Sequence, residues 1–157
     1  VHTNKKGVIC AGGDGAKGRG VGKWGPYFKD KPLIEKYGVA TFSSNYNLYG
    51  DLSWRVMETL RMLLPPYCVE VYSVDESFLD LSHIPKEQLQ RFSVYLKETV
   101  EQWTGINVSI GVAPTKVLSK VANRLSNKHK DDSNCVLVFD TPRKIAHALQ
   151  KTLSDDD

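Results

Sequence analysis

The chain has 157 residues, of which 41% are hydrophobic and 25% charged, and its formal net charge is +3. This composition is that of a globular domain with a core, and it excludes a largely disordered or fibrous chain. The mild positive charge is compatible with a nucleic-acid partner without establishing one. The three widely spaced cysteines form no metal-binding pattern, and free thiols indicate the cytoplasm. No apolar run approaches the ~18 residues of a membrane span.

Glycine is concentrated near the N-terminus, where eight of the twelve glycines lie within residues 7–25. A glycine costs a helix about 1 kcal/mol relative to alanine, so residues 12–25 are predicted to hold little stable helix. Pro26 and Pro32 extend this loop character. Residues 39–42 are predicted to form a strand. We therefore expect an irregular segment over residues 1–38 and the main domain over residues 39–157.

The rest of the chain alternates between helical and strand-like patterns. Apolar residues at three- and four-residue steps predict a helix over residues 48–63, which Pro65 ends. Residues 68–74 and 78–81 alternate as strands do, and the short connection predicts an antiparallel hairpin. The remaining predicted elements are a helix over residues 86–103, a strand over 107–112, a helix after Pro114, a strand over 136–139 and a helix over 142–150.

The last helices carry recognisable start signals. Pro114 suits the first turn of its helix, and Thr141 and Pro142 suit the N-cap and first position of the final one. The predicted order is β-α-β-β-α-β-α-β-α. This order indicates an α+β fold close to a ferredoxin-like arrangement, with helices packed on a mostly antiparallel sheet.

Asp75 and Glu76 are the first candidates for chemistry, because they lie at the predicted hairpin between two strands. A turn can bring adjacent carboxylates toward one rim, where oxygen ligands suit Mg²⁺. Two such ions about 3.5–4 Å apart would activate a hydroxyl and stabilise a leaving pyrophosphate. By itself, such a pair is more often a charged turn in water than a metal site.

A row of basic residues lies on the helix after Pro114. The four side chains are spaced four residues apart and so share one face, about 6 Å between neighbours, which suits a phosphate backbone or a triphosphate. A solvated basic face would have the same pattern. The row consists of Lys116, Lys120, Arg124 and Lys128.

Residues 13–18, Gly-Asp-Gly-Ala-Lys-Gly, match the GxGxxG pattern of dinucleotide-binding loops. That site requires the turn to open a helix. The glycines and proline that follow predict that no stable helix starts here, so we expect no dinucleotide site.

Three segments in order resemble one family. Residues 69–81, Val-Glu-Val-Tyr-Ser-Val-Asp-Glu-Ser-Phe-Leu-Asp-Leu, and residues 109–123, Ser-Ile-Gly-Val-Ala-Pro-Thr-Lys-Val-Leu-Ser-Lys-Val-Ala-Asn, are similar to the palm hairpin and following strand and helix of Y-family (translesion) DNA polymerases. Residues 42–53, which begin Phe-Ser-Ser-Asn-Tyr, resemble its UmuC-type branch, the catalytic subunit of DNA polymerase V and plasmid relatives. The resemblance covers roughly residues 38–140.

The resemblance implies a partial fingers segment over residues 1–38 and a palm domain over residues 39–157. It also implies template-directed nucleotidyl transfer past damaged bases, in DNA repair and the SOS response. Asp75 and Glu76 match the hairpin carboxylates that bind two Mg²⁺ ions, and Glu76 would help to activate the primer 3′-hydroxyl. Implied partners are a DNA primer-template, an incoming deoxynucleoside triphosphate, a UmuD-type subunit and a RecA filament. Residues matching regions near the triphosphate or DNA are Lys17, Lys116, Lys120, Arg124 and Lys128.

The sequence departs from the family pattern in several places. The fingers segment usually reads Ala-Arg-Asn-Ala-Glu-Ala-Lys, whereas residues 11–17 keep Lys17 but have Gly12 at the arginine. The phosphate-binding lysine expected late in the third helix falls on Asn127. The third metal ligand, an aspartate on the first strand, and the aromatic residue after it would precede Val1. We also expect the thumb and little finger to lie outside residues 1–157. We therefore expect no measurable primer extension from this chain alone.

Two other functions remain open at this stage. One is a catalytically inactive palm that binds DNA or a partner. The other is a different palm-fold enzyme such as a nucleotidyl cyclase. The second is disfavoured, because it would give no role to the Pro-Thr-Lys helix start or to the Ser-Ser-Asn-Tyr segment.

Overall fold

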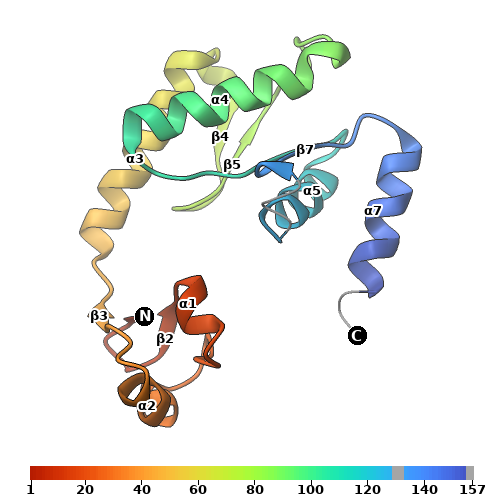
Figure 1. Cartoon of the computed structure of the whole chain (residues 1–157). Helices are drawn as coiled ribbons and strands as arrows, with labels where there is room; N and C mark the ends of the chain where they lie inside the picture. Colours follow the sequence, from red (N-terminus) through yellow and green to blue (C-terminus); the bar gives the residue numbers. More distant parts are fainter. Residues whose placement is uncertain (129–132, 155–157) are drawn as a thin grey trace. The chain divides into compact units, whose positions relative to one another are not determined.

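The computed structural model describes residues 1–128 and 133–154, with side chains to residue 150 (Figure 1). The chain forms two compact units, Val1–Leu48 and Tyr49–Asp157. The first unit thus extends beyond residue 38, because the strand β3 (Phe42–Ser43) pairs with the strand β1 (His2–Thr3). Assignment of the expected segments 1–38 and 39–157 to fingers and palm remains a prediction. No described helix has the length and apolar character needed to cross a bilayer.

The N-terminal unit is built on a three-stranded sheet in the order β2-β1-β3. The strand β2 (Ile9–Ala11) runs antiparallel to β1, and β3 runs parallel to it. Two helices join this sheet, α1 (Asp14–Lys17) and α2 (Tyr27–Lys36). The core of the unit consists of Val1, Ile9, Val21 and Ile34.

Two expectations for this unit were wrong. A one-turn helix, α1, does start within the glycine-rich stretch, where the N–H groups of Ala16 and Lys17 donate to the carbonyl of Gly13. The helix α2 includes Pro32, which was expected to extend a loop. Although Pro32 lacks an N–H donor, burial of Ile34 in the core stabilises the helix around it.

The C-terminal unit contains most of the remaining elements, and the helix α3 leads into it from the first unit. In chain order they are α3 (Tyr46–Leu63), η1 (Pro66–Cys68), β4 (Val69–Val71), β5 (Ser77–Leu79), η2 (Lys86–Gln88), α4 (Leu89–Thr104), β6 (Ile110–Val112), α5 (Lys116–Lys128), β7 (Val136–Val138) and α7 (Pro142–Ser154).

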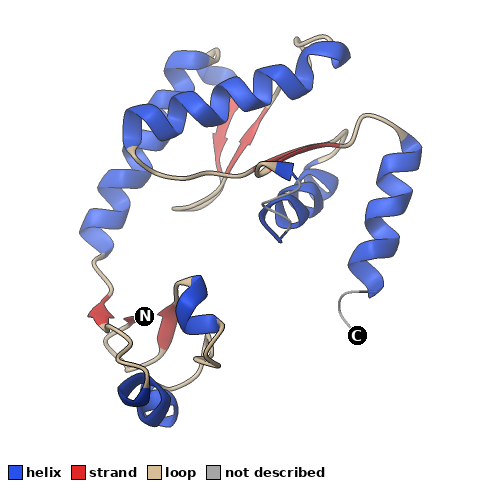
Figure 2. Cartoon of the chain, in the orientation of Figure 1, coloured by secondary structure: helices blue, strands red, loops and turns tan. Residues whose placement is uncertain are grey.

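The α+β class is confirmed. The strands of this unit pair as two short sheets, β4-β5 and β6-β7, flanked by helices (Figure 2). The β4-β5 pair is antiparallel, as predicted for the hairpin, while β6 and β7 run parallel. The predicted cap of the last helix is confirmed, since the N–H of Lys144 donates to Thr141 Oγ1 over 3.4 Å.

Two apolar clusters hold this unit together. The larger lies between α3, α4 and the start of β4, and consists of Met57, Leu60, Leu64, Cys68, Val69, Leu96 and Val100. The smaller joins α5 and α7 beside β7, and consists of Ala122, Leu125, Phe139 and Ala148. The apolar residues of these helices are only partly buried, because Trp103 on α4 and Val117 on α5 are exposed.

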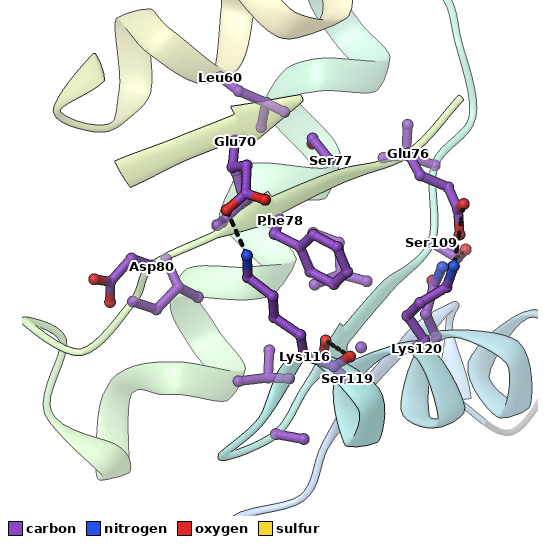
Figure 3. A pocket seen from close by; sticks show the side chains of 18 of the residues that line it. Leu60, Glu70, Glu76, Ser77, Phe78, Asp80, Ser109, Lys116, Ser119 and Lys120 are labelled. Carbon is purple, nitrogen blue, oxygen red and sulfur yellow. Dashed lines mark hydrogen bonds and ion pairs between the residues drawn. The ribbon is translucent and has the colours of Figure 1, made fainter. Parts of the chain in front are cut away.

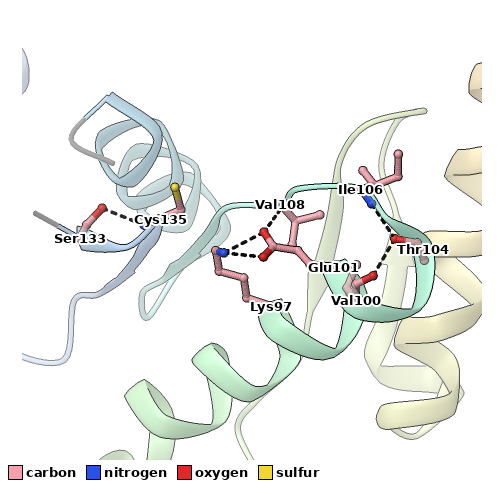
Figure 4. A network of polar contacts seen from close by, with 8 residues as sticks. All are labelled: Lys97, Val100, Glu101, Thr104, Ile106, Val108, Ser133 and Cys135. Carbon is pink, nitrogen blue, oxygen red and sulfur yellow. Dashed lines mark hydrogen bonds and ion pairs between the residues drawn. The ribbon is translucent and has the colours of Figure 1, made fainter. Parts of the chain in front are cut away.

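A polar network at the end of α4 fixes the segment that enters β6 (Figure 4). Lys97 Nζ donates to both carboxylate oxygens of Glu101, at 2.7 and 2.8 Å, with only 11% of the lysine side chain exposed. Glu101 Oε1 also accepts the backbone N–H of Val108 over 3.1 Å. Gly105 ends α4 in the left-handed conformation, at φ 71°. These contacts hold the chain leading to β6 against α4.

Candidate functional site

The predicted carboxylate pair lies at the tip of the β4-β5 hairpin. The strands pair with Glu70 opposite Phe78, and the N–H groups of Tyr72 and Ser73 both donate to the carbonyl of Glu76, at 3.1 and 3.0 Å. This places Asp75 in the turn and Glu76 directly before β5. Asp75 is exposed, and Ser73 Oγ donates to its Oδ1 over 2.8 Å.

The helix α5 faces this hairpin because Gly111, which has no side chain, allows the helix to pack closely on β6. A Cβ on Gly111 would lie 2.1 Å from the backbone nitrogen of Asn123, so a side chain at this position would clash with α5. Ser109 Oγ also donates to Asn123 Oδ1 over 2.7 Å. Small side chains on the helix, Ala122 and Ser126, are fully buried. The backbone of α5 therefore lies against β6, and its basic face turns toward the hairpin.

Two lysines of the predicted basic row reach the hairpin (Figure 3). Lys116 pairs with Glu70, and Lys120 Nζ lies 3.4 Å from Glu76 Oε2. Thr115 supports the first turn of the helix, since its Oγ1 accepts the N–H of Leu118. The carboxylates of the hairpin and the cations of α5 thus face each other, although they come from distant parts of the sequence.

A cleft of about 1220 Å³ is lined by the hairpin, α5, β6 and one face of α3. Its walls include the apolar edges of β5 and β6, and its charged lining residues are Glu70, Asp75, Glu76, Asp80, Lys86, Lys116, Lys120 and Asp140. An opening of this size with opposed charges can accept a charged ligand together with an apolar surface.

The other predicted binding residues are placed differently. Arg124 and Lys128 continue α5, and neither is among the described residues that line the cleft. Lys17 belongs to the N-terminal unit, where its Nζ lies 3.3 Å from Asp14 Oδ1. The roles of all three stay predictions.

Asp80 has a local structural role at the end of the hairpin. Hydrogen bonds from the Ser82 side chain and then from its backbone N–H hold the pKa of Asp80 below its usual value. The backbone donor lies 2.9 Å from Oδ1. Since Asp80 is occupied by the turn that follows β5, it is a weaker candidate for ligand binding than the pair at the tip.

The hairpin pair has the chemistry of a partial Mg²⁺ site. Both side chains offer carboxylate oxygens, and Mg²⁺ is often held by one or two carboxylates together with waters and substrate phosphates. Within residues 1–128 and 133–154, no group of three or more His, Cys, Asp or Glu side chains could enclose a metal. The residues present therefore fit an ion whose other ligands come from outside the hairpin.

Sequence reasoning did not single out three residues around this cleft. Glu70 pairs with Lys116, whose Nζ also lies 5.1 Å from the centroid of Phe78, and Tyr72 lies under Lys120. Strand alternation places Glu70 and Tyr72 on one face, so their shared orientation was predictable. That α5 covers this face depends on the packing at Gly111, which alternation does not reveal.

Comparison with known proteins decides the family. The impB/mucB/samB family matches residues 1–124, which extends the resemblance into the glycine-rich segment. The chain belongs to the impB/mucB/samB family. Protein UmuC of Salmonella typhimurium is 39% identical over 138 residues, or 87% of this chain and 32% of that protein. Protein ImpB of the same species is 38% identical over 125 residues, covering 78% of this chain and 28% of ImpB.

Solved structures agree with the family assignment. The insertion ternary complex of Dbh DNA polymerase superposes with a TM-score of 0.69 at 25% identity, covering 83% of this chain and 36% of the polymerase. This impB/mucB/samB family chain therefore spans about a third of the length of the relatives it matches. The resemblance to the UmuC-type branch is confirmed.

Proposed function

We propose that this chain forms the palm of an error-prone DNA polymerase that carries out translesion synthesis by template-directed nucleotidyl transfer. The observation that carries the proposal is the position of Asp75 and Glu76 at the hairpin tip, opposite the lysines of α5 across one cleft. Family membership supports this reading, since Dbh DNA polymerase shares the fold.

In this proposal the side chains divide into two groups by charge. Asp75 and Glu76 supply carboxylate oxygens to divalent metal, with two Mg²⁺ ions expected, and Glu76 also helps to orient the primer 3′-hydroxyl. A bound metal would stabilise charge on the reacting phosphate. The cations that approach the triphosphate or the DNA backbone are Lys17, Lys116, Lys120, Arg124 and Lys128.

The partners follow from the same chemistry. A primer-template and a deoxynucleoside triphosphate present phosphates to the basic face of α5. A UmuD-type subunit and a RecA filament, and a cytoplasmic location, are further parts of the proposal that rest on family resemblance. The alternative is a palm that binds DNA or a protein without catalysis.

Iron-mediated DNA cleavage tests the proposal against this alternative. Fe²⁺ replaces Mg²⁺ at carboxylate sites, and with ascorbate and peroxide it cuts DNA close to the ion. With the chain bound to labelled primer-template at low salt, we expect cleavage concentrated at the primer 3′ end. Asp75→Asn and Glu76→Gln should each remove this cleavage while DNA binding persists.

The outcome that would overturn the proposal is equally specific. Cleavage spread along the duplex, or unchanged by both substitutions, would place the metal elsewhere and favour the binding module. Asp51→Asn is the matched control, because Asp51 is an exposed carboxylate of the same unit that pairs with Arg55 at 3.0 Å. It should leave the cleavage pattern unchanged.

A further inference from the structure

Lys120 already provides a cation to one of the two proposed metal ligands. Its Nζ lies 3.4 Å from Glu76 Oε2 (Figure 3). The same Nζ lies 4.5 Å from the centroid of the Tyr72 ring. Tyr72 and Glu76 face each other at the hairpin tip, where the N–H of Tyr72 donates to the carbonyl of Glu76. The carboxylate and the aromatic face together bind the ammonium group through an ion pair and a cation–π contact.

Lys116 provides an internal comparison one turn earlier. Lys116 makes the same two contacts with the next cross-strand pair: an ion pair with Glu70 and a cation–π contact with Phe78. Glu70 is not part of the proposed metal pair. The two lysines therefore make the same kind of contact, but only that of Lys120 involves a proposed metal ligand.

An ammonium and a divalent ion cannot share the Glu76 oxygen without strong repulsion. We infer that Lys120 competes with the metal for Glu76 and moves to a phosphate anion when one enters the cleft. Metal and polyphosphate then bind more tightly together than either does alone. This inference concerns regulation of the proposed metal site and rests on that proposal.

The geometry allows Lys120 to change partners. Its side chain is 45% exposed and that of Glu76 is 39% exposed, and ion pairs of this exposure are weak and easily broken. A lysine also carries its charge on a flexible four-carbon stem, which reaches over several ångströms without movement of the helix. Lys120 is thus held in place loosely enough to be displaced.

The first measurement is the affinity for Mn²⁺ without any phosphate. The electron paramagnetic resonance signal of free Mn²⁺ monitors the binding. Lys120→Gln removes the competitor, so we expect Mn²⁺ to bind roughly two- to fivefold more tightly. Lys116→Gln should give a smaller gain. Lys31→Gln, which breaks an exposed lysine–glutamate pair in α2, is the control for the loss of one positive charge.

The second measurement is binding of tripolyphosphate in EDTA by calorimetry. Here Lys120→Gln should bind several-fold more weakly than the unmodified chain, because the anion loses a cation. Lys120→Arg should restore tripolyphosphate binding. Changes of opposite sign for the two ligands distinguish an exchange of partners from a merely structural effect, which would weaken both.

The two proposals fail in different ways. If Glu76→Gln leaves Mn²⁺ affinity unchanged, the metal site itself is wrong. If Glu76→Gln weakens Mn²⁺ binding but Lys120→Gln does not strengthen it, only the competition is overturned. An equal gain from Lys116→Gln or Lys31→Gln would also overturn it, since a general loss of positive charge would then explain the result.

Discussion

Gly111 leaves the space in which α5 lies against β6. Its missing side chain brings the backbone of the helix close to the strand, and the buried Ala122 and Ser126 continue this close contact. The helix then presents Lys116 and Lys120 to the hairpin. One residue without a Cβ therefore positions two charges of the candidate site.

Gly111→Ala should destabilise the C-terminal unit by about 3 kcal/mol, because the added methyl group meets helix backbone rather than a mobile side chain. Gly50→Ala is the matched control, since it lies within α3 with no atom near its added Cβ. We expect it to stabilise by roughly 0.5–1 kcal/mol. Urea unfolding followed by circular dichroism measures both, and a neutral Gly111→Ala would contradict the close packing.

Among the helices and strands, the connection from α4 to β6 depends on a nearly buried ion pair. Lys97 and Glu101 satisfy each other, and Glu101 also accepts the N–H of Val108 before the strand begins. The helical pattern of residues 86–103 already predicted α4. The position of β6 next to α5 depends on these contacts and on Gly105, which ends α4 in the left-handed conformation.

Glu101→Ala should cost about 2 kcal/mol of unfolding free energy. It leaves the Lys97 ammonium, 11% exposed, without its partner, and partial exposure reduces the cost of a fully buried pair. Asp51→Ala breaks an exposed pair on α3 and should change stability by less than about 0.5 kcal/mol. Equal effects of the two substitutions in thermal or urea unfolding would show that the network contributes no more than a surface pair.

Across the whole molecule, the described strands form separate small sheets, and charges from α5 and the hairpin gather at one cleft of the C-terminal unit. The net charge of +3 is too small to predict nucleic-acid binding by itself. What favours it is the grouping of basic residues along one helix face.

We predict weak, salt-sensitive DNA binding through the basic face of α5. Reversing Lys120 and Arg124 to glutamate should lower the affinity for a primer-template about tenfold at low salt and make its salt dependence less steep. Fluorescence anisotropy over a salt series measures both. Reversal of Arg55 and Arg61 on α3 controls for net charge, and an unchanged affinity in the Lys120 and Arg124 variant would reject this face.

The order of most elements and the antiparallel hairpin were predictable from the sequence, because periodicity, proline stops and short connections act locally. The family was predictable from three motifs in order. The sequence also identified Asp75 and Glu76 as candidates and placed Lys116 and Lys120 on one helix face. It missed the helix around Pro32, because burial of Ile34 outweighs a local propensity.

Which charges pair with each other depends on how the elements pack in three dimensions. The pairing of Lys116 with Glu70 and of Lys120 with Glu76 joins residues more than forty positions apart, and depends on how closely α5 approaches β6. Packing between elements also determines which residues of α5 are buried: Val117 is exposed, whereas Ala122 is buried. Such contacts arise from packing between elements, whereas a pattern along one element shows only which residues share a face.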